Sequence, residues 1–100
     1  MRIIAKRTIV RFAERHPLAK PALYRWAGAI EAGEWRSMAE LSASFSSAKV
    51  LNADRVRFAI GGGAFRLIAG FDFHHQIAFI KFIGTHEDYD RIDALTVAQF

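Results

Sequence analysis

The sequence predicts a small α+β protein in which two N-terminal helices pack on one face of a mainly antiparallel sheet. Two observations lead to this prediction. Apolar residues recur at helical spacing as far as residue 32, whereas from Arg55 onward they alternate with period two. The expected order of elements is β-α-α-β-β-β-α. With 100 residues, we expect a single domain over residues 1–100, because one hydrophobic core rarely divides below about 250 residues.

The first predicted elements are a short strand at residues 2–5 and a helix that follows it. Ile9, Phe12 and Ala13 have the spacing i, i+3, i+4, which places them on one apolar face of a helix. The opposite face carries three basic residues four positions apart, Arg7, Arg11 and Arg15. The pair His16-Pro17 ends this helix, because a residue before proline is disfavoured in the helical conformation.

A second helix is predicted from about Pro21 to Ala32, with Gly33 as its stop. Its inward residues are Leu23, Trp26 and Ile30. Residues 34–50 give a weaker pattern: a capping box from Ser37 to Glu40 starts a short helix, and a serine-rich turn follows.

The sheet is predicted from three strands in the second half of the chain. Val56, Phe58 and Ile60 alternate with Arg55, Arg57 and Ala59, which is typical of a half-buried strand. The triplet Gly61-Gly62-Gly63 is expected to form the turn of a hairpin whose return strand is 65–69. After a turn at 72–75, the strand 77–83 is apolar on both faces, so we expect it to be the central one. A final helix begins at Thr85, whose capping partner is Asp88.

Composition and charge narrow the function. The chain contains no cysteine, which excludes disulfides and cysteine-ligated zinc. No apolar run approaches the roughly 20 residues that cross a bilayer, and residues 1–7 are too short for a signal peptide, so we expect a cytoplasmic protein. The net charge is +4, and the first 25 residues hold seven basic groups against one acid. This asymmetry favours a polyanionic partner at the basic end.

The residues with the most chemical potential lie near the end of the chain and in two strands. His86, Tyr89 and Asp90 share one side of the last predicted helix. Arg66 and Lys81 stand within apolar strands, where a charge needs either a partner or a function. Cleavage of RNA by its own 2′-hydroxyl requires groups that move protons and cations that stabilise a dianionic transition state. These five side chains meet that requirement, but structural ion pairs of Arg66 and Lys81 with Asp72, Asp90 or Asp93 are an open alternative.

A possible zinc site and two groups of arginines each have a simpler explanation. His86 and Asp90, with one of His74 or His75, approach the three ligands of a catalytic zinc site, although adjacent histidines usually point apart, so we expect no metal and no cofactor. The stripe of Arg7, Arg11 and Arg15 either binds RNA phosphates or is a solvated helix face. Arg55 and Arg57 share the solvent-facing side of their strand, and they either form a basic RNA-binding surface beside Arg66 across the hairpin or protect an edge strand.

The sequence resembles the HigB-type toxins of bacterial toxin–antitoxin modules, within the wider RelE/ParE-like group. The resemblance covers about residues 2–95. It is carried by the helix that contains Trp26 and by five motifs, namely Arg2-Ile3-Ile4, His16-Pro17, Arg55-Val56-Arg57-Phe58, Phe65-Arg66-Leu67-Ile68 and Phe82-Ile83-Gly84-Thr85-His86-Glu87-Asp88-Tyr89-Asp90. The closing Thr-His-x-x-Tyr-Asp run is the most specific of these. The hairpin departs from the pattern of relatives, because Ala59, Gly63 and Phe65 stand where Asn, Asn and Tyr are common.

The resemblance implies a RelE-like fold and a metal-independent endoribonuclease, an mRNA interferase, that cuts mRNA on the ribosome and inhibits translation. It implies a cognate HigA-like antitoxin with a helix-turn-helix DNA-binding domain. The catalytic roles then fall on Arg66, Lys81, His86 and Tyr89, with Asp90 orienting His86. RNA binding falls on the remaining basic residues named above, Arg7, Arg11, Arg15, Arg55 and Arg57. The alternative function is a non-catalytic toxin that acts by protein or ribosome binding, as a ParE-like poison of DNA gyrase.

Overall fold

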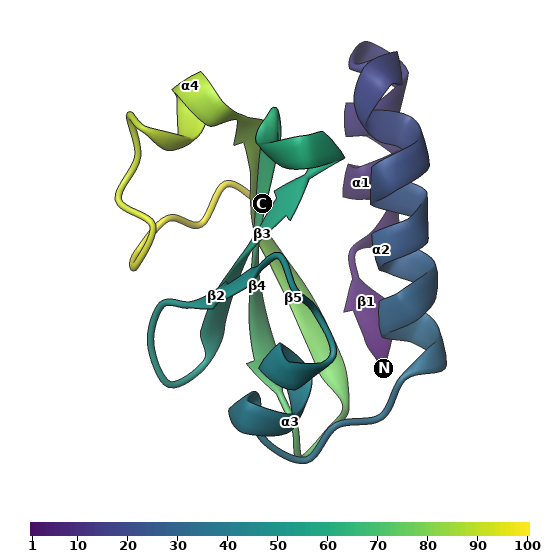
Figure 1. The fold of residues 1–100 in the computed structure, drawn as a ribbon, viewed down its shortest axis with the longest axis vertical. Helices are drawn as coiled ribbons and strands as arrows, with labels where there is room; N and C mark the ends of the chain where they lie inside the picture. The colour runs from purple at the N-terminus through teal and green to yellow at the C-terminus, as the bar shows by residue number, and fades with distance from the viewer.

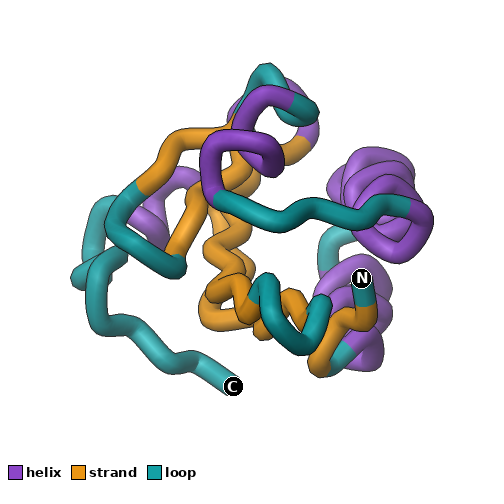
Figure 2. Tube along the Cα trace, turned by 90° about the horizontal axis from the view of Figure 1, so that it is seen from below, coloured by secondary structure: helices purple, strands orange, loops and turns teal.

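The computed structural model describes all residues 1–100 and shows a twisted five-stranded sheet between two unequal layers (Figures 1 and 2). Helices α1 and α2 cover one side of the sheet, and α4 with the end of the chain lies on the other. The elements are β1 (Arg2–Ile4), α1 (Lys6–Arg15), a 3₁₀ turn (Pro17–Ala19), α2 (Lys20–Ala32), α3 (Met38–Ala43), β2 (Ala48–Val50), β3 (Arg55–Ile60), a second 3₁₀ turn (Gly61–Gly63), β4 (Phe65–Asp72), β5 (Ile77–Thr85) and α4 (His86–Tyr89). The predicted α+β class and the pair of N-terminal helices are confirmed.

The strand order is β1-β5-β4-β3-β2, with β1 parallel to β5 and every other pair antiparallel. The prediction that residues 77–83 form the central strand is wrong, because β4 occupies that place. β4 pairs with both β5 and β3, and one short edge strand lies beyond each of these: β1 flanks β5, and β2 flanks β3. Burial agrees, since the five consecutive residues 67–71 of β4 are all buried.

The region 34–50 contributes more structure than its sequence predicts. Ser37 caps α3 by accepting a hydrogen bond from the Glu40 backbone N–H at 3.2 Å, as expected from the capping box. The strand β2, which pairs with β3, was predicted only as a turn. Its three residues are too few to show a period of two, so only the pairing with β3 reveals it. Because β2 lies outside β3, Arg55 and Arg57 do not protect an edge strand.

The turn between β3 and β4 depends on glycine. Gly61, Gly62 and Gly63 all have positive φ, between 61° and 97°. Residues with a side chain rarely adopt this backbone conformation, whereas glycine does so at little steric cost, so the triplet forms the predicted tight turn. The strands then continue as a ladder from Ile60↔Phe65 to Arg55↔Gly70.

The core lies between the helical layer and one face of the sheet, which we call the core face. Ile9 and Phe12 from α1, and Leu23, Trp26 and Ile30 from α2, are buried there as predicted. They meet side chains from the sheet that include Val56, Phe58, Leu67, Ala69 and Ile83. No charged or polar residue is buried in the protein, so this face is held by apolar packing.

A β-bulge in β5 decides which side chains reach the other side of the sheet. Ile68 pairs with Phe82 but Ala69 pairs with Ile80, so Lys81 has no partner in β4. The extra residue resets the alternation. Ile80 and Ile83 therefore both point into the core, while Lys81 and Phe82 between them point to the opposite face. We call that opposite surface of β3, β4 and β5 the open face.

Residues 90–100, which we call the C-terminal segment, run back from α4 along the open face (Figure 1). Arg55 Nη1 donates hydrogen bonds to the carbonyls of Ala94 at 3.2 Å and Val97 at 2.7 Å. Gln99 then bonds to the backbone of β5. No helix in the structure has the length and apolar character needed to cross a membrane.

Candidate active site on the open face of the sheet

The predicted helix start after β5 brings the acidic C-terminal motif against the hairpin turn. Thr85 Oγ1 accepts a hydrogen bond from the Asp88 backbone N–H at 3.1 Å, and the Asp88 carboxylate accepts one from the Thr85 N–H at 3.4 Å. The His86 backbone N–H also donates to the Ala64 carbonyl at 3.0 Å. These bonds hold His86 beside Ala64, which lies just before β4 and two residues before Arg66.

His86 and Asp90 form the polar pair that their spacing predicts. His86 Nδ1 lies 3.1 Å from Asp90 Oδ2, and both side chains are exposed. A carboxylate on Nδ1 orients the imidazole and leaves Nε2 available for proton transfer. Tyr89, on the same short helix, is half-buried, and its ring centroid lies 6.2 Å from that of Phe82.

Arg66 projects from the open face next to this pair. It lies directly across from Gly84, which has no side chain and stands two residues before His86. The guanidinium donates to the carbonyl of Gly63 and, at 3.4 Å, to that of Phe65, but its Nε is buried without a hydrogen-bond partner. No carboxylate lies within 4.0 Å of it, so the predicted alternative of a structural ion pair is not found.

Arg57 joins Arg66 on the open face. Arg57 pairs with Ile68, two residues along β4 from Arg66, so the two arginines are diagonal neighbours about 7–8 Å apart. Arg57 Nε is also buried without a partner, and no carboxylate neutralises the guanidinium. Two unneutralised guanidinium groups on neighbouring strands oppose folding and favour an anionic ligand.

The structure does not bring Lys81 to this group. Lys81 Cε lies 3.2 Å from the position that a Cβ on Gly70 would occupy, so the side chain crosses β4 at Gly70. Gly70 is four residues from Arg66, about 13 Å along the strand. Lys81 has no carboxylate within 4.0 Å, and its ammonium lies 5.4 Å from the Phe79 ring centroid. The five predicted catalytic residues therefore divide into one group of four and Lys81 by itself.

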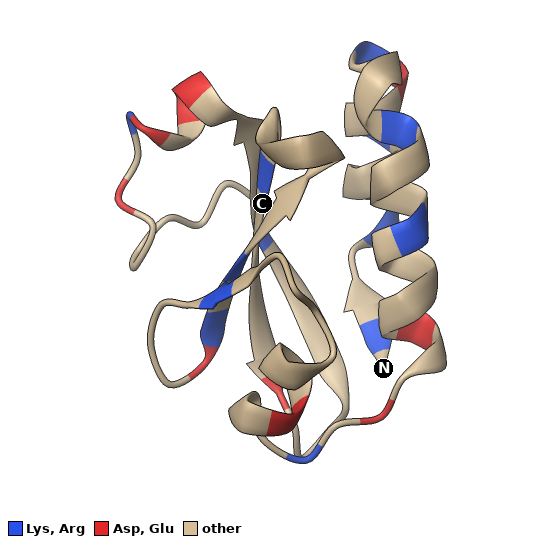
Figure 3. Cartoon of the chain, viewed as in Figure 1, with Lys and Arg blue, Asp and Glu red and all other residues tan.

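The predicted RNA-binding residues also divide into groups. Arg57 lies in the site, whereas Arg55 is engaged by the C-terminal segment. Arg7, Arg11 and Arg15, the arginine stripe, are all exposed on α1. Arg7 and Arg11 line a groove of about 400 Å³ that also contains Lys81 and Phe79. Four of the ten Asp and Glu residues lie on α4 and the loop after it, and the others are spread over the remaining helices, the loops and the end of β4 (Figure 3).

The zinc alternative has no three-ligand site, since no three His, Asp or Glu side chains gather in the structure. His75 and Asp72 form a separate pair in the turn between β4 and β5, with Nδ1 2.8 Å from Oδ2. This pair is at the opposite end of β5 from His86, about 26 Å along the strand. The hydrogen bonds from His75, through its backbone N–H and its ring, hold the pKa of Asp72 below its ordinary value.

Two features of this surface, a β-bulge and an apolar floor, are not among those predicted from the sequence. The bulge that turns Lys81 and Phe82 to one side is hidden in a strand whose residues are nearly all apolar. Phe82 is only 3% exposed and, with Ile68, forms a small apolar floor beneath α4 that lies outside the main core. The change from alternation to a three-residue spacing between Ile80 and Ile83 is the pattern that could have revealed both.

Comparison with known proteins agrees with this geometry. Residues 19–92 match the profile of the HigB toxins, described as the RelE-like toxic component of a toxin–antitoxin system. The mRNA interferase toxin HigB of Escherichia coli strain K12 is 30% identical over 98 aligned residues, which cover 95% of this chain and 93% of that protein. The proteins named mRNA interferase HigB from Escherichia coli O157:H7 and Shigella flexneri give the same identity and coverage.

The fold and the matched residues define a RelE-like toxin of a toxin–antitoxin system. Within that class, the chain belongs to the HigB toxin family. The predicted family is therefore confirmed, and the predicted endoribonuclease class agrees with the name of the relatives.

Proposed function

We propose that this toxin is an endoribonuclease that cleaves mRNA on the ribosome without a metal ion, in the bacterial cytoplasm. The observation that carries the proposal is the placement of Arg66, without a carboxylate partner, beside the His86–Asp90 pair at one end of the open face. Residues 1–100 act together as one toxin domain. The cognate antitoxin is expected to be a helix-turn-helix protein that silences it.

The reaction needs one proton removed and one supplied. The 2′-hydroxyl of a ribose attacks the adjacent phosphorus, so a bond forms between O2′ and phosphorus while the bond to the 5′-oxygen breaks. The proton of the 2′-hydroxyl passes to a base, and the 5′-oxygen receives a proton from an acid. His86 and Tyr89 are the two groups at this end of the sheet that can fill these roles. Asp90 orients His86 through Nδ1.

Arg66 and Arg57 stabilise the phosphate during the attack. The transition state carries more negative charge than the ground state, so a cation that contacts it lowers the barrier. The two arginines lie on neighbouring strands, and neither guanidinium is paired with a carboxylate. Lys81, further along the open face, is placed to bind a flanking phosphate of the same strand.

Two observations support a mechanism without a metal. The arginine pair already supplies the positive charge that a metal ion contributes in other nucleases. The Asp90 carboxylate is paired with His86, and no third His, Asp or Glu side chain gathers with them to form a metal-binding group. The ribosome as the place of cleavage follows from the resemblance to HigB-type toxins and is tested directly below.

The test compares Arg66→Ala with Arg91→Ala. Both positions lie near α4, but Arg91 is exposed and paired with Glu87 at 2.8 Å, whereas Arg66 has no carboxylate partner. Arg66→Ala is expected to lower the cleavage rate by about 10²–10³-fold, the effect of removing one preorganised donor. Arg91→Ala should cleave like the parent protein. Urea unfolding of both variants verifies that the fold is intact.

Cleavage is measured by mapping new 5′ ends in mRNA, with and without ribosomes, and by determining whether these ends carry a hydroxyl or a phosphate. New ends that require ribosomes and carry a 5′-hydroxyl support the proposal, because attack by the 2′-hydroxyl leaves the 5′-oxygen without a phosphate. Ends that carry a 5′-phosphate, the product of attack by metal-activated water, contradict the metal-independent mechanism, and equal cleavage of free mRNA contradicts ribosome dependence. Growth arrest with intact mRNA and damaged DNA would instead indicate the gyrase-poison alternative.

A further inference from the structure

The C-terminal segment is fastened to the sheet at two places. Arg55 holds it over β3 through the carbonyls of Ala94 and Val97. Beyond the end of β1, Gln99 bonds to β5 twice: its backbone N–H donates to the Lys81 carbonyl at 2.9 Å, and its side-chain oxygen accepts from the Ile83 N–H at 2.9 Å. The residue after Gln99 is thereby held in a defined place beside the edge of β5.

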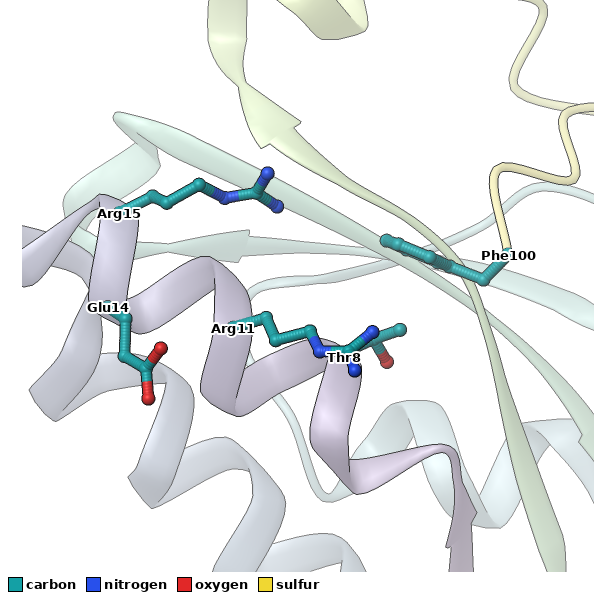
Figure 4. A pocket seen from close by; sticks show the side chains of 5 residues that line it. All are labelled: Thr8, Arg11, Glu14, Arg15 and Phe100. Carbon is teal, nitrogen blue, oxygen red and sulfur yellow. The ribbon is translucent and has the colours of Figure 1, made fainter.

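That residue is Phe100, and its ring faces helix α1 (Figure 4). The ring, with Thr8, Glu14, Arg11 and Arg15, lines a groove of about 340 Å³. A neighbouring groove shares Thr8, Arg11 and Phe100 and extends to Lys81. Phe100 is 53% exposed, so an aromatic face is open to a ligand at this place.

The arginine stripe opposite Phe100 is not explained by the stability of α1. Arg7 and Arg11, and Arg11 and Arg15, are like charges at i, i+4, and each such pair destabilises a helix by roughly 0.2–0.5 kcal/mol. Arg7 also lies in the first turn, where the helix dipole disfavours a cation. Although Glu14 lines the groove, no carboxylate comes within 4.0 Å of any of the three guanidiniums.

We propose that Arg11, Arg15 and Phe100 form a binding subsite for one nucleotide of the single-stranded RNA that is cleaved, outside the active site itself. The base stacks on Phe100, and its phosphate lies between the two arginines. Single-stranded nucleic acid is bound in this way, by an aromatic face beside a basic track, because every base has a π face and every nucleotide a phosphate. The proposal deepens the proposed function and rests on it for the identity of the ligand.

The position of α1 connects this subsite to the active site. The helix runs alongside β5 from Ala5, near Phe79, to its last turn at the hairpin. There Phe12 contacts Phe65, with ring centroids 5.9 Å apart, and Phe65 precedes Arg66. The last turn of α1 therefore reaches the hairpin that carries Arg66, although Phe65 faces the core and Arg66 the open face. Lys81 lines the groove beside Arg11 and Phe100.

The test measures binding of a short 2′-O-methyl RNA, which lacks the attacking hydroxyl and cannot be cleaved. Phe100→Ala is expected to weaken binding by about 5- to 150-fold, the range that corresponds to one base stacked on an aromatic ring. Phe100→Tyr should retain the parent affinity. The matched control is Tyr24→Ala. Tyr24, in α2, is an exposed aromatic residue near a cation, Lys20, and it lines a groove between α1 and α2 to which Phe100 does not contribute.

Two further arms separate stacking from charge. With abasic RNA, the parent protein and Phe100→Ala should bind equally. The double variant Arg11→Ala/Arg15→Ala should reduce the dependence of log affinity on log salt concentration by about 0.7, the value for one phosphate contact on a single strand. Thermal unfolding verifies that each variant is folded.

Equal binding by Phe100→Ala and the parent protein overturns the subsite, as does the lack of measurable RNA binding by the parent protein. A loss of antitoxin affinity with unchanged RNA affinity also overturns it and assigns the groove to a protein partner. Because the RNA cannot be cleaved, this result is independent of the Arg66→Ala test. A subsite that fails leaves the cleavage function standing, and a protein that binds RNA without cutting it leaves the subsite standing.

Discussion

The two faces of the sheet are made by the same strands but satisfy opposite requirements. On the core face, Val56, Phe58 and Leu67 are fully buried against the helices, and the one polar atom enclosed there without a hydrogen-bond partner is the neutral Trp26 indole nitrogen. On the open face, Arg57 and Arg66 stand one residue away along the same strands, with buried Nε atoms that have no partner. The core face thus provides stability, and it holds the open face in a state that is unfavourable until an anion binds.

The open face is nevertheless not wholly polar. Ile68 and Phe82 form an apolar floor between the Arg66 end and the Lys81 end, and α4 packs on it through Tyr89. This floor keeps His86 and Tyr89 in place, since α4 has only four residues and cannot be stable by itself. The difference between the faces is therefore testable by substitutions on each of them.

The largest effect is expected from the core face. Phe58→Ala removes a fully buried ring that contacts Trp26 and Phe71, with centroids at 5.2 Å and 6.2 Å. It should lower the free energy of unfolding by about 3–5 kcal/mol. Urea denaturation measures this loss, and cleavage should fall only in proportion to the unfolded fraction. A loss below about 1 kcal/mol would show that the core face is not the main source of stability.

An intermediate effect is expected from Gly84→Ala on the open face. The new Cβ would stand 2.5 Å from Phe82 Cζ and 3.1 Å from Asp88 Cβ, and the buried Phe82 ring has little room to move. We expect a loss of about 1–3 kcal/mol in unfolding free energy, the usual range for overpacking, and a larger loss of cleavage because α4 shifts.

The matched control for Gly84→Ala is Gly28→Ala. Nothing lies within 4 Å of the position of its Cβ, and Gly28 is inside α2, so alanine should stabilise the protein by about 0.5–1 kcal/mol. If Gly84→Ala cleaves RNA like the control, the floor beneath α4 does not position the active site.

The smallest effect is expected at the exposed turn that ends the open face. The folded state lowers the pKa of Asp72 through hydrogen bonds from His75, so the carboxylate stabilises the fold above its ordinary pKa of 3.8. That stabilisation is lost as the pH falls through the lowered pKa. Asp72→Asn should therefore lower the melting temperature slightly at pH 7 and leave it unchanged below the lowered pKa. A difference that grows in acid would contradict this sign.

The candidate site could be predicted in part from the sequence. The capping box at Thr85 and the i, i+4 spacing of His86 and Asp90 are local patterns, and both appear in the structure as expected. The proximity of Arg66 to His86 is not local, because it depends on the register that sets Arg66 opposite Gly84. The separation of Lys81 from Arg66 follows from the same register and the bulge.

The sequence by itself determined the α+β class, the two N-terminal helices and the residues that carry charge within apolar strands. Period and capping are properties of neighbouring residues, so they can be recognised without the fold. The tertiary structure alone decided that β4 is central, that Arg57 and not Arg55 is free to act beside Arg66, and that Phe100 faces the arginine stripe. These arrangements join residues far apart in the chain, and strand order, register and one extra residue in β5 set them.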